Sequence, residues 1–480
     1  MITPEEALSK VNKLYAELSK RRRDVDHFEA YFRCEQPLAF ASQEWKNFNA
    51  DRFKGFSDNW CGVVASSPAE RIKLTGVRLG TDSDILSDDE VQLMSDWQRN
   101  EMDAQSSQGI LHTIITGRSA VIVWPDEYGD PRMDWERADQ VIVAYEPGGR
   151  RRVAALKAWV DGELEYATLY LPDELWKFQR PVEKRGFVNL ILPAGVGREE
   201  VAWTPREVDG ELWPVQNPLG EVPVVEVPNR PMLGAEPISD IAGTISMQNA
   251  INLLWAYLFA AADYASMPAR VVMGQEPPKI PVLDENGVKV GEKPVDIDAL
   301  TRGRMLWLTG QDTTVGQWDP ARLDGFLDVI NRSVRHVAAQ TRTPVHYIVG
   351  ELANVNGETL LAGETGLVKK VEEWHLFGSG SLRDVFRLSA LIRGRQAVAE
   401  ALRSARILWA DPQTRTQAQA SDAAIKDRQV GFPLAWVAEQ RYGLTPPEVQ
   451  RMLELRDAES ASLLTGDLAA AFGPKPQPSA

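Results

Sequence analysis

The sequence predicts an α+β fold: an N-terminal domain of helices and short strands, two long helices around a small β-rich segment, and a helical C-terminal region. Three observations lead to this prediction. Short β-rich runs are concentrated between Ala120 and Val227. Two long helical patterns flank residues 267–319, which are rich in proline and glycine, and helical patterns dominate after residue 357. With 480 residues, 25% of them charged and 44% hydrophobic, the chain has the composition of a globular protein of roughly two to four domains.

The first helix has a clear start. Thr3 and Glu6 have the spacing of a capping box, and Pro4 stands at the first helical position, where its missing N–H costs nothing. The apolar period then continues to about Lys20. Ser87 and Glu90 repeat the capping box before a second helix.

Strand patterns follow from Ala120 to Val227. They include AVIVW, QVIVAY, VAALKAWV and ELEYATLYL, and Asp161-Gly162 between the last two predicts a β-hairpin. A proline-rich segment at 217–234 marks the end of this N-terminal α+β domain.

Two long helices are predicted next. The first covers residues 238–265, about 40 Å at 1.5 Å per residue, and the second covers residues 320–342. Between them, Met305–Leu308 is the clearest strand of a small β module. Since the helices have similar lengths, we expect them to lie side by side with the β module at their far end.

A short polar loop, ELANVNGE, separates this pair from another long helix at about 357–395, in which Gly378–Gly380 is a candidate break. A helical region at about 412–466 follows, and the final residues GPKPQPSA have the composition of a disordered tail. The loop's two asparagines and its glycine are explained by ordinary turn chemistry. Its position between two long helices indicates instead a loop that is held out to contact something.

The second long helix has two distinct faces. At 100° per residue one face carries an apolar stripe of Leu323, Phe326, Leu327, Ile330, Val334 and Val337. The opposite face carries Arg332, Arg335 and Arg342, with Asp324 and Asp328 among them. One interpretation is a surface that touches phosphate at intervals. The other is a solvated face on which Asp328 and Arg332 pair at i,i+4.

Charge, cysteine content and hydropathy limit the function. Fifty-three basic and 68 acidic side chains give a formal charge of −15, which argues against a protein that grips nucleic acid and suits a conduit that repels it. Cys34 and Cys61 are too few for a disulfide framework or a zinc site of the usual spacing. The apolar run at 250–265 falls short of the roughly 20 residues that a membrane span needs, and no secretion signal is expected at the polar N-terminus.

Signatures of catalysis and metal binding are weak. GVKVGEK at 287–293 lacks the spacing and the final hydroxyl residue of a phosphate-binding loop, and no HExxH or GxSxG pattern occurs. The acidic run of Asp82, Asp84, Asp88 and Asp89 lacks the glycine and the terminal glutamate of a calcium loop. The five histidines are scattered. We therefore predict no catalytic residues, no metal site, no cofactor and no enzymatic activity.

Four segments together resemble the portal proteins of long-tailed bacteriophages, in the branch common among phages of actinobacteria. They are VPNRPMLGAEPISDI (227–241), FLDVINRSVRHVAAQTRTPVHYIVG (326–350), ETLLAGETGLVKKVEEWHLFGSGSLRDVFRLS (358–389) and WADPQTRTQAQASDAAIKDRQVGFPLAWVAEQRYGLTPPEVQRM (409–452). They cover most of residues 225–455 in the family's order. Residues 1–220 resemble the family mainly in length and α+β texture.

The resemblance implies the phage portal fold. Carried over by position, its parts are an α+β wing (1–236), a first stem helix (237–266), a β-containing clip (267–319), a second stem helix (320–342), a tunnel loop with a long wing helix (343–402), a helical crown (403–470) and a disordered tail (471–480). The residues of the tunnel loop that would face a DNA channel are Glu351, Leu352, Ala353, Asn354, Val355 and Asn356. Arg332, Arg335 and Arg342 are then the candidates for channel-facing stem residues.

The resemblance also implies partners. We expect a ring of identical subunits, a dodecamer, at one capsid vertex, with double-stranded DNA passing through it. The terminase large subunit, head–tail adaptors, and the major capsid and scaffold proteins are the expected protein partners, and no membrane is expected. The protein would act in the virion after assembly in the host cytoplasm.

Two other functions remain open on the sequence. One is a structural adaptor of the virion that passes no DNA. The other is an enzyme, such as a nuclease or hydrolase, whose carboxylates come from separate segments and whose activity would require magnesium.

Overall fold

The computed structural model describes residues 2–36, 38–39, 58–80, 87–182, 202–208, 210–266, 270–273, 279–283, 289–294, 305–308, 314–317, 323–349, 357–413 and 417–472. The chain forms two compact units. The first comprises Met1–Arg33, Cys61–Gly243 and Thr341–Ala480, and the second comprises Cys34–Trp60 and Thr244–Gln340.

The first unit begins with helix α1 (Pro4–Phe32), capped at Thr3 by the predicted capping box with Glu6. The helix continues well beyond Lys20, where the prediction ended it. Its buried stripe extends through Val25 and Tyr31, so the basic run at 21–23 is only a polar stretch within the helix.

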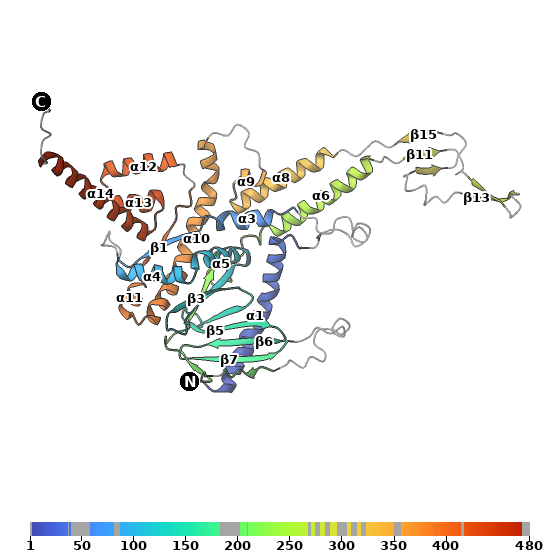
Figure 1. Cartoon of the computed structure of the whole chain (residues 1–480). Helices are drawn as coiled ribbons and strands as arrows, with labels where there is room; N and C mark the ends of the chain where they lie inside the picture. The colour runs from blue at the N-terminus through green and yellow to red at the C-terminus, as the bar shows by residue number, and fades with distance from the viewer. Residues whose placement is uncertain are drawn as a thin grey trace, which may run out of the picture. The chain divides into compact units, whose positions relative to one another are not determined.

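The largest sheet is antiparallel and six-stranded. It runs in the order β4 (Val141–Tyr145), β5 (Arg152–Asp161), β6 (Leu164–Tyr170), β7 (Glu174–Pro181) and β8 (Thr204–Pro205), and β9 (Val215–Gln216) also pairs with β7. The predicted hairpin at Asp161-Gly162 joins β5 and β6. Helix α1 packs on one face of this sheet, where Leu14 and Leu18 belong to the same core as Leu156 and Phe178 (Figure 1).

A second sheet covers the other face. It contains β10 (Val224–Pro228), β2 (Arg118–Pro125) and β3 (Pro131–Glu136) in that order. Ile122 and Val224 of this sheet share a core with Val143, Ala155 and Leu175 of the larger sheet. The N-terminal part of this unit is therefore a helix on a two-sheet sandwich.

The remaining elements of the first unit are mostly helices. They are α3 (Trp60–Ala69), α4 (Asp88–Arg99), α5 (Met102–Thr116), α9 (Val345–Val349), α10 (Gly357–Ile392), α11 (Gln396–Ala401), α12 (Gln417–Val430), α13 (Leu434–Tyr442) and α14 (Pro446–Phe472). The second predicted capping box, Ser87 with Glu90, caps α4. The disordered tail that we predicted at 471–480 begins within α14, and residues 473–480 lie outside the described residues.

Helix α10 is continuous through Gly378–Gly380, where the sequence suggested a break. Gly378 has a packing role instead, because a Cβ at this position would lie 2.6 Å from the indole ring of Trp374. Further along the helix, the Phe386 and Trp97 rings lie 5.4 Å apart and join α10 to α4.

One small sheet was not predicted. It pairs β1 (Leu74–Arg78) with β16 (Arg406–Trp409) in antiparallel orientation. The two strands come from distant parts of the sequence, so no local pattern indicated their pairing.

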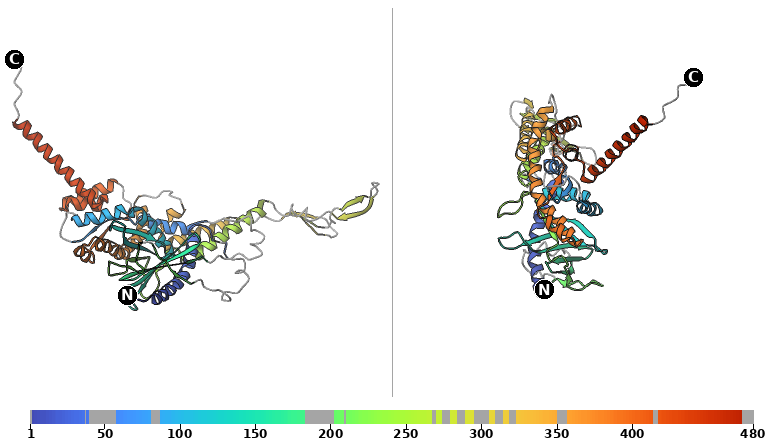
Figure 2. Two further views of the ribbon diagram at one scale, coloured as in Figure 1. Left: turned by 60° about the horizontal axis from the view of Figure 1, so that its bottom comes forward. Right: turned by 90° about the vertical axis from the view of Figure 1, so that its left-hand side faces the viewer.

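The second unit contains α6 (Ile245–Ser266) and α8 (Asp324–Thr341), which run side by side in two views (Figures 1 and 2). Helix α6 begins at Ile245 and not at residue 238 as predicted, because residues 241–244 form turns. Five short strands lie beyond the two helices: β11 (Arg270–Met273), β12 (Lys279–Leu283), β13 (Lys289–Pro294), β14 (Met305–Leu308) and β15 (Thr314–Gln317). Strand β14 is the predicted strand, and it pairs with β11 in parallel orientation.

Polar side chains of α6 bind the segment before α3. Gln248 Oε1 accepts a hydrogen bond from the Trp60 amide at 2.8 Å, and Asn252 Oδ1 accepts one from the Asp58 amide at 2.9 Å. Trp255 Nε1 donates to the Asp58 carboxylate at 3.1 Å, and burial raises the pKa of this carboxyl group. Asn252, which interrupts the apolar run at 250–265, and Gln248 just before the run thus satisfy backbone groups. Within the described residues, no helix combines the length and hydropathy that crossing a bilayer requires.

Candidate functional site

Helix α8 carries two of the three arginines that the sequence singled out. Ile330, Val334 and Val337 of the predicted apolar stripe are buried. Arg332 and Arg335 are exposed, and neither forms an ion pair with a described residue. The Asp328–Arg332 pair of the alternative interpretation is therefore not formed. The stripe is less complete than predicted, because Leu327 is 40% exposed and both Leu323 and Phe326 are only half-buried.

The third arginine leaves the helix. Helix α8 ends at Thr341, and Arg342 has a left-handed backbone with φ of 57°. Arg342 therefore does not continue the face of Arg332 and Arg335, as the prediction required. Its guanidinium lies 3.4 Å from the carboxylate of Glu373 on α10, and both side chains are about half exposed (56% and 49%).

A buried ion pair with His346 and the exposed Tyr347 beside it joins α9 to α10. Glu364 on α10 lies 3.2 Å from the guanidinium of Arg71, and the two side chains are 9% and 10% exposed. Tyr347 on α9 donates its hydroxyl to Glu364 Oε1 at 3.4 Å and accepts a hydrogen bond from Arg71. His346 Nε2 lies 3.6 Å from the same carboxylate oxygen. Arg71 also donates to the carbonyl of Pro412 at 3.0 Å, so three separate parts of the first unit meet here.

A second buried pair supports the same helix. Lys370 lies 2.6 Å from the carboxylate of Asp240, with side-chain exposures of 12% and 3%, and Asn229 donates to that carboxylate at 2.9 Å. Lys370 also donates to the carbonyl of Thr341 at 3.4 Å. The chain before residues 350–356 is thus held to α10 by the hydrogen bonds at Tyr347 and Thr341, and α10 after them is held by two buried ion pairs.

The predicted tunnel-loop residues Glu351, Leu352, Ala353, Asn354, Val355 and Asn356 lie outside the described residues. What the structure describes is their base, with Tyr347 shortly before them and Glu364 shortly after. We call the cluster of Arg71, His346, Tyr347 and Glu364 the loop base.

The sequence prediction missed the loop base, although one signal was present. Glu364 stands on the same side of α10 as the buried residues Leu367, Val371 and Trp374, at helical spacing. A carboxylate in an apolar stripe requires a buried partner. The identity of that partner, Arg71, could not be read from so distant a part of the sequence.

Titratable groups elsewhere stabilise the fold. Glu29 accepts hydrogen bonds from His112 and Arg137, which lower the pKa of its carboxyl group to about 2. His112 Nε2 accepts a hydrogen bond from the amide N–H of Ala138 at 2.9 Å, so both ring nitrogens of this imidazole already have partners. Among the described residues, no three His, Cys, Asp or Glu side chains converge on a possible metal position. Asp82 and Asp84 lie outside the described residues.

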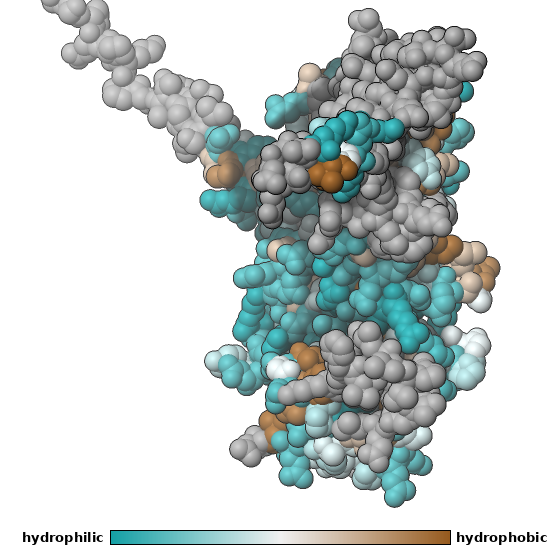
Figure 3. Space-filling view, turned by 90° about the vertical axis from the view of Figure 1, so that its right-hand side faces the viewer, coloured by the Kyte–Doolittle hydropathy of each residue, from teal (hydrophilic) through white to brown (hydrophobic). Residues whose placement is uncertain are grey.

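The exposed surface around these elements is polar. One face of the molecule shows hydrophilic residues over most of its described area, with small and separate hydrophobic patches (Figure 3). The candidate site, as far as the structure describes it, consists of the exposed Arg332 and Arg335 on α8 and the loop base.

Comparison with known proteins decides the family. The family model described as "Phage portal protein, SPP1 Gp6-like" matches residues 39–432. The chain belongs to this family of phage portal proteins. The portal protein of Mycobacterium phage L5 is 28% identical over 389 residues, covering 76% of this chain and 71% of that protein. The portal protein of Mycobacterium phage D29 is 28% identical over 388 residues, with the same coverage.

The family match confirms the resemblance seen in the sequence, and both portal relatives belong to phages of an actinobacterium. This portal-family chain is therefore a structural component of a phage virion. Two solved chains are also similar. One is from the virion of the native gene transfer agent particle, with 13% identity and a TM-score of 0.39, and the match covers 77% of this chain and 83% of that one. The other is from the neck of the empty particle computed with C6 symmetry, with 12% identity and a TM-score of 0.39, and the match covers 77% of this chain and 85% of that one.

Proposed function

We propose that this chain forms a closed ring of twelve copies at one capsid vertex, through which double-stranded DNA enters during packaging and leaves during ejection. The observation that carries the proposal is the portal family match over residues 39–432. In this proposal residues 1–236 are the wing, α6 and α8 are the stem helices, residues 267–319 are the clip, and residues 403–470 are the crown.

The charge of the chain suits passage rather than retention of DNA. At −15 per subunit, a ring would repel the phosphate backbone over most of its surface. The exposed arginines Arg332 and Arg335 offer isolated phosphate contacts, which slow DNA little because each one is screened at physiological salt.

The loop base gives residues 351–356 a fixed origin. Buried ion pairs at Glu364 and Lys370 hold α10, which follows the loop, and the hydrogen bonds of Tyr347 and of the Thr341 carbonyl tie the segment before the loop to the same helix. A loop with a rigid base can follow the DNA surface while its ends transmit force to the ring. This is what a channel loop requires.

Catalysis forms no part of the proposal. The free energy for packaging would come from nucleotide hydrolysis by the terminase, which docks on the ring together with the head–tail adaptors. The ring itself would assemble in the host cytoplasm with the scaffold and major capsid proteins.

Negative-stain electron microscopy of the purified full-length chain tests the proposal. We expect class averages along the symmetry axis to show closed rings with a central hole wide enough for a DNA duplex. Closed assemblies without such a hole would favour the structural adaptor, and a chain that remains a monomer at every concentration would contradict the proposed ring.

A further inference from the structure

The loop between β10 and α6 exposes two large apolar side chains. Residues 230–236 form a continuous exposed run, in which Leu233 is 97% exposed and Met232 is 53% exposed. We call this run the prong. A nearly fully exposed leucine beside an exposed methionine does not stabilise the isolated chain, and such side chains are typical of contact sites.

The prong has a rigid base. The backbone carbonyl of Asn229 accepts a hydrogen bond from the amide N–H of Ile238 at 3.2 Å, and the Asn229 side-chain amide donates one to the carbonyl of Ile238 at 2.8 Å. These two hydrogen bonds close the loop. Asn229 itself is 1% exposed. Arg118 forms an ion pair with Glu236, and Gly234 takes a left-handed conformation with φ of 70° at the tip. Because the base is fixed, little conformational entropy would be lost when the tip is buried.

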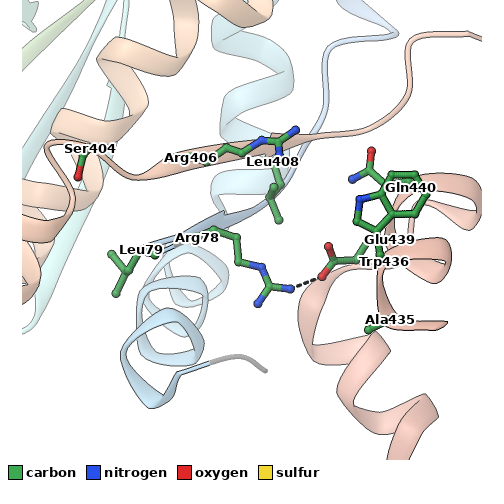
Figure 4. A pocket seen from close by; sticks show the side chains of 10 residues that line it. Arg78, Leu79, Ser404, Arg406, Leu408, Ala435, Trp436, Glu439 and Gln440 are labelled. Carbon is green, nitrogen blue, oxygen red and sulfur yellow. Dashed lines mark hydrogen bonds and ion pairs between the residues drawn. The ribbon is translucent and has the colours of Figure 1, made fainter. Parts of the chain in front are cut away.

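A groove lies between β16 and α13. Two adjoining cavities of about 420 and 410 Å³ share the lining residues Arg406, Leu408, Trp436, Glu439 and Gln440. Figure 4 shows the first cavity, with Leu408 and the Trp436 ring on its walls and Glu439 paired with Arg78. Leu79 and Ala435 add apolar surface, so this otherwise polar cavity contains an apolar strip of Leu79, Leu408, Ala435 and Trp436.

The prong and the groove lie on opposite sides of α10. Lys370, Glu373 and Phe377 line a small cavity together with Arg230 and Asp240 at the base of the prong. Glu372 and His375 line the groove, and these positions fall on the other side of the helix at 100° per residue. Two different patches on opposite flanks are what a head-to-tail contact between identical subunits uses, and such contacts close into rings.

The prong carries Arg230 as well as Glu236, and its Glu236 is the charge that can pair with a cation of the groove. Arg406 is exposed in the groove and forms an ion pair with no described residue. Glu236 of the prong is 81% exposed, and within the described part of the chain only Arg118 pairs with it. A methionine at the tip also suits a tryptophan-lined cavity, because thioether–aromatic contacts are favourable.

We infer that the prong of one subunit inserts Met232 and Leu233 into the groove between β16 and α13 of the next copy of this chain. The inference rests on the proposed ring, and it identifies one contact that joins neighbouring subunits.

Cysteine cross-linking tests this contact. In a Cys34→Ser background, Leu233→Cys is combined with Gln440→Cys, while the buried Cys61 is retained. The control combines Gln440→Cys with Tyr128→Cys, since Tyr128 is 78% exposed on the turn between β2 and β3. We expect mild oxidation of assembled rings to give a ladder of covalent oligomers for the first pair only. Equal ladders for both pairs, or a ladder for neither, would contradict the contact.

A substitution in the prong provides a second readout. Leu233→Asp is expected to lower the ring fraction at least tenfold at a fixed concentration, because it replaces the apolar side chain that would contact Leu408 and the Trp436 ring with a hydrated carboxylate. The circular dichroism of the monomer should stay unchanged, since Leu233 touches little of its own chain. Wild-type rings together with normal assembly of Leu233→Asp would overturn the inference and leave the proposed function intact. If the wild-type chain formed no rings, the proposed function would fail first.

Discussion

The carboxylate of Glu364 lies on the apolar side of α10, where its charge is offset by Arg71 and by the hydroxyl of Tyr347. Two charges that are about 90% buried cost several kcal/mol each in lost hydration, and close pairing recovers that cost. The pair therefore adds little net stability, but removing one partner leaves the other charge buried and unpaired. The cluster instead links Arg71, α9 and α10 within the first unit, on both sides of residues 350–356 in the sequence.

Glu364→Gln should destabilise the first unit by about 3–5 kcal/mol, because Arg71 keeps its charge in a buried position. The control is Glu372→Gln on the same helix, whose exposed i,i+3 pair with Lys369 contributes about 0–1 kcal/mol. The midpoint of urea unfolding, followed by tryptophan fluorescence, measures both variants. Similar midpoints for the two variants would show that the loop base is not the fixed point described above.

A buried histidine gives the same helix a pH dependence. His375 stacks on Trp409 with ring centroids 4.6 Å apart, and burial lowers the pKa of its imidazole to about 4. The unfolded chain, with a pKa near 6.5, binds a proton that the folded chain does not bind between about pH 6.5 and 4. His375 therefore reduces the stability of the folded chain progressively as the pH falls through this window.

We expect His375→Phe to keep the stacking on Trp409 and to remove this loss. The urea midpoints of the variant and the wild type should differ by a constant amount above pH 7. Between pH 6.5 and 4, the midpoint of the variant should rise relative to that of the wild type. A constant difference across the whole range would exclude His375 as the titrating group.

At the scale of elements, the sequence correctly predicted the features that depend on residues close together in the chain. Both capping boxes, the Asp161-Gly162 hairpin and strand β14 are where the sequence placed them. The pairing of β1 with β16 could not be predicted, because both strands are short and find each other only in the folded chain. The start of α6 was placed too early for a related reason. Ser239 and Asp240 have helix-compatible neighbours, but tertiary hydrogen bonds to the end of α5 hold them in turns.

The corrected start of α6 gives a matched pair of proline substitutions. Ala256 is fully buried in the helix interior, so Ala256→Pro should cost about 3 kcal/mol or more and abolish ring assembly. Ile245 is the first residue of the helix, where proline removes no intrahelical hydrogen bond, so Ile245→Pro should assemble normally. Size-exclusion chromatography with light scattering separates the outcomes, and normal rings from Ala256→Pro would refute the role of α6 as a stem helix.

At the scale of the whole molecule, the proposed function depends on a scaffold that carries a loop. The portal family could be predicted from segments spread over residues 225–455, because their order along the chain is itself informative. The candidate site was predicted less well. Arg332 and Arg335 share an exposed face as expected, but Arg342 leaves the helix and pairs with Glu373, since its left-handed backbone begins the turn toward α9. The residues of the loop base could not be predicted, because Arg71 meets Glu364 only in the folded chain, as Asp240 meets Lys370.

Deleting Ala353–Asn356 separates the scaffold from the loop. The loop base at Tyr347 and Glu364 lies outside the deletion, and residues 350–352 remain between α9 and α10. We therefore expect closed rings of normal size in electron micrographs and a thermal midpoint within about 1 °C of the wild type, since surface changes away from buried groups have small effects. DNA packaged per particle, measured as nuclease-protected genome, should fall at least tenfold, because the ring loses its contact with the moving duplex. Normal packaging by the deletion variant would remove residues 353–356 from the proposed channel, and a failure to form rings would show instead that these residues belong to the scaffold.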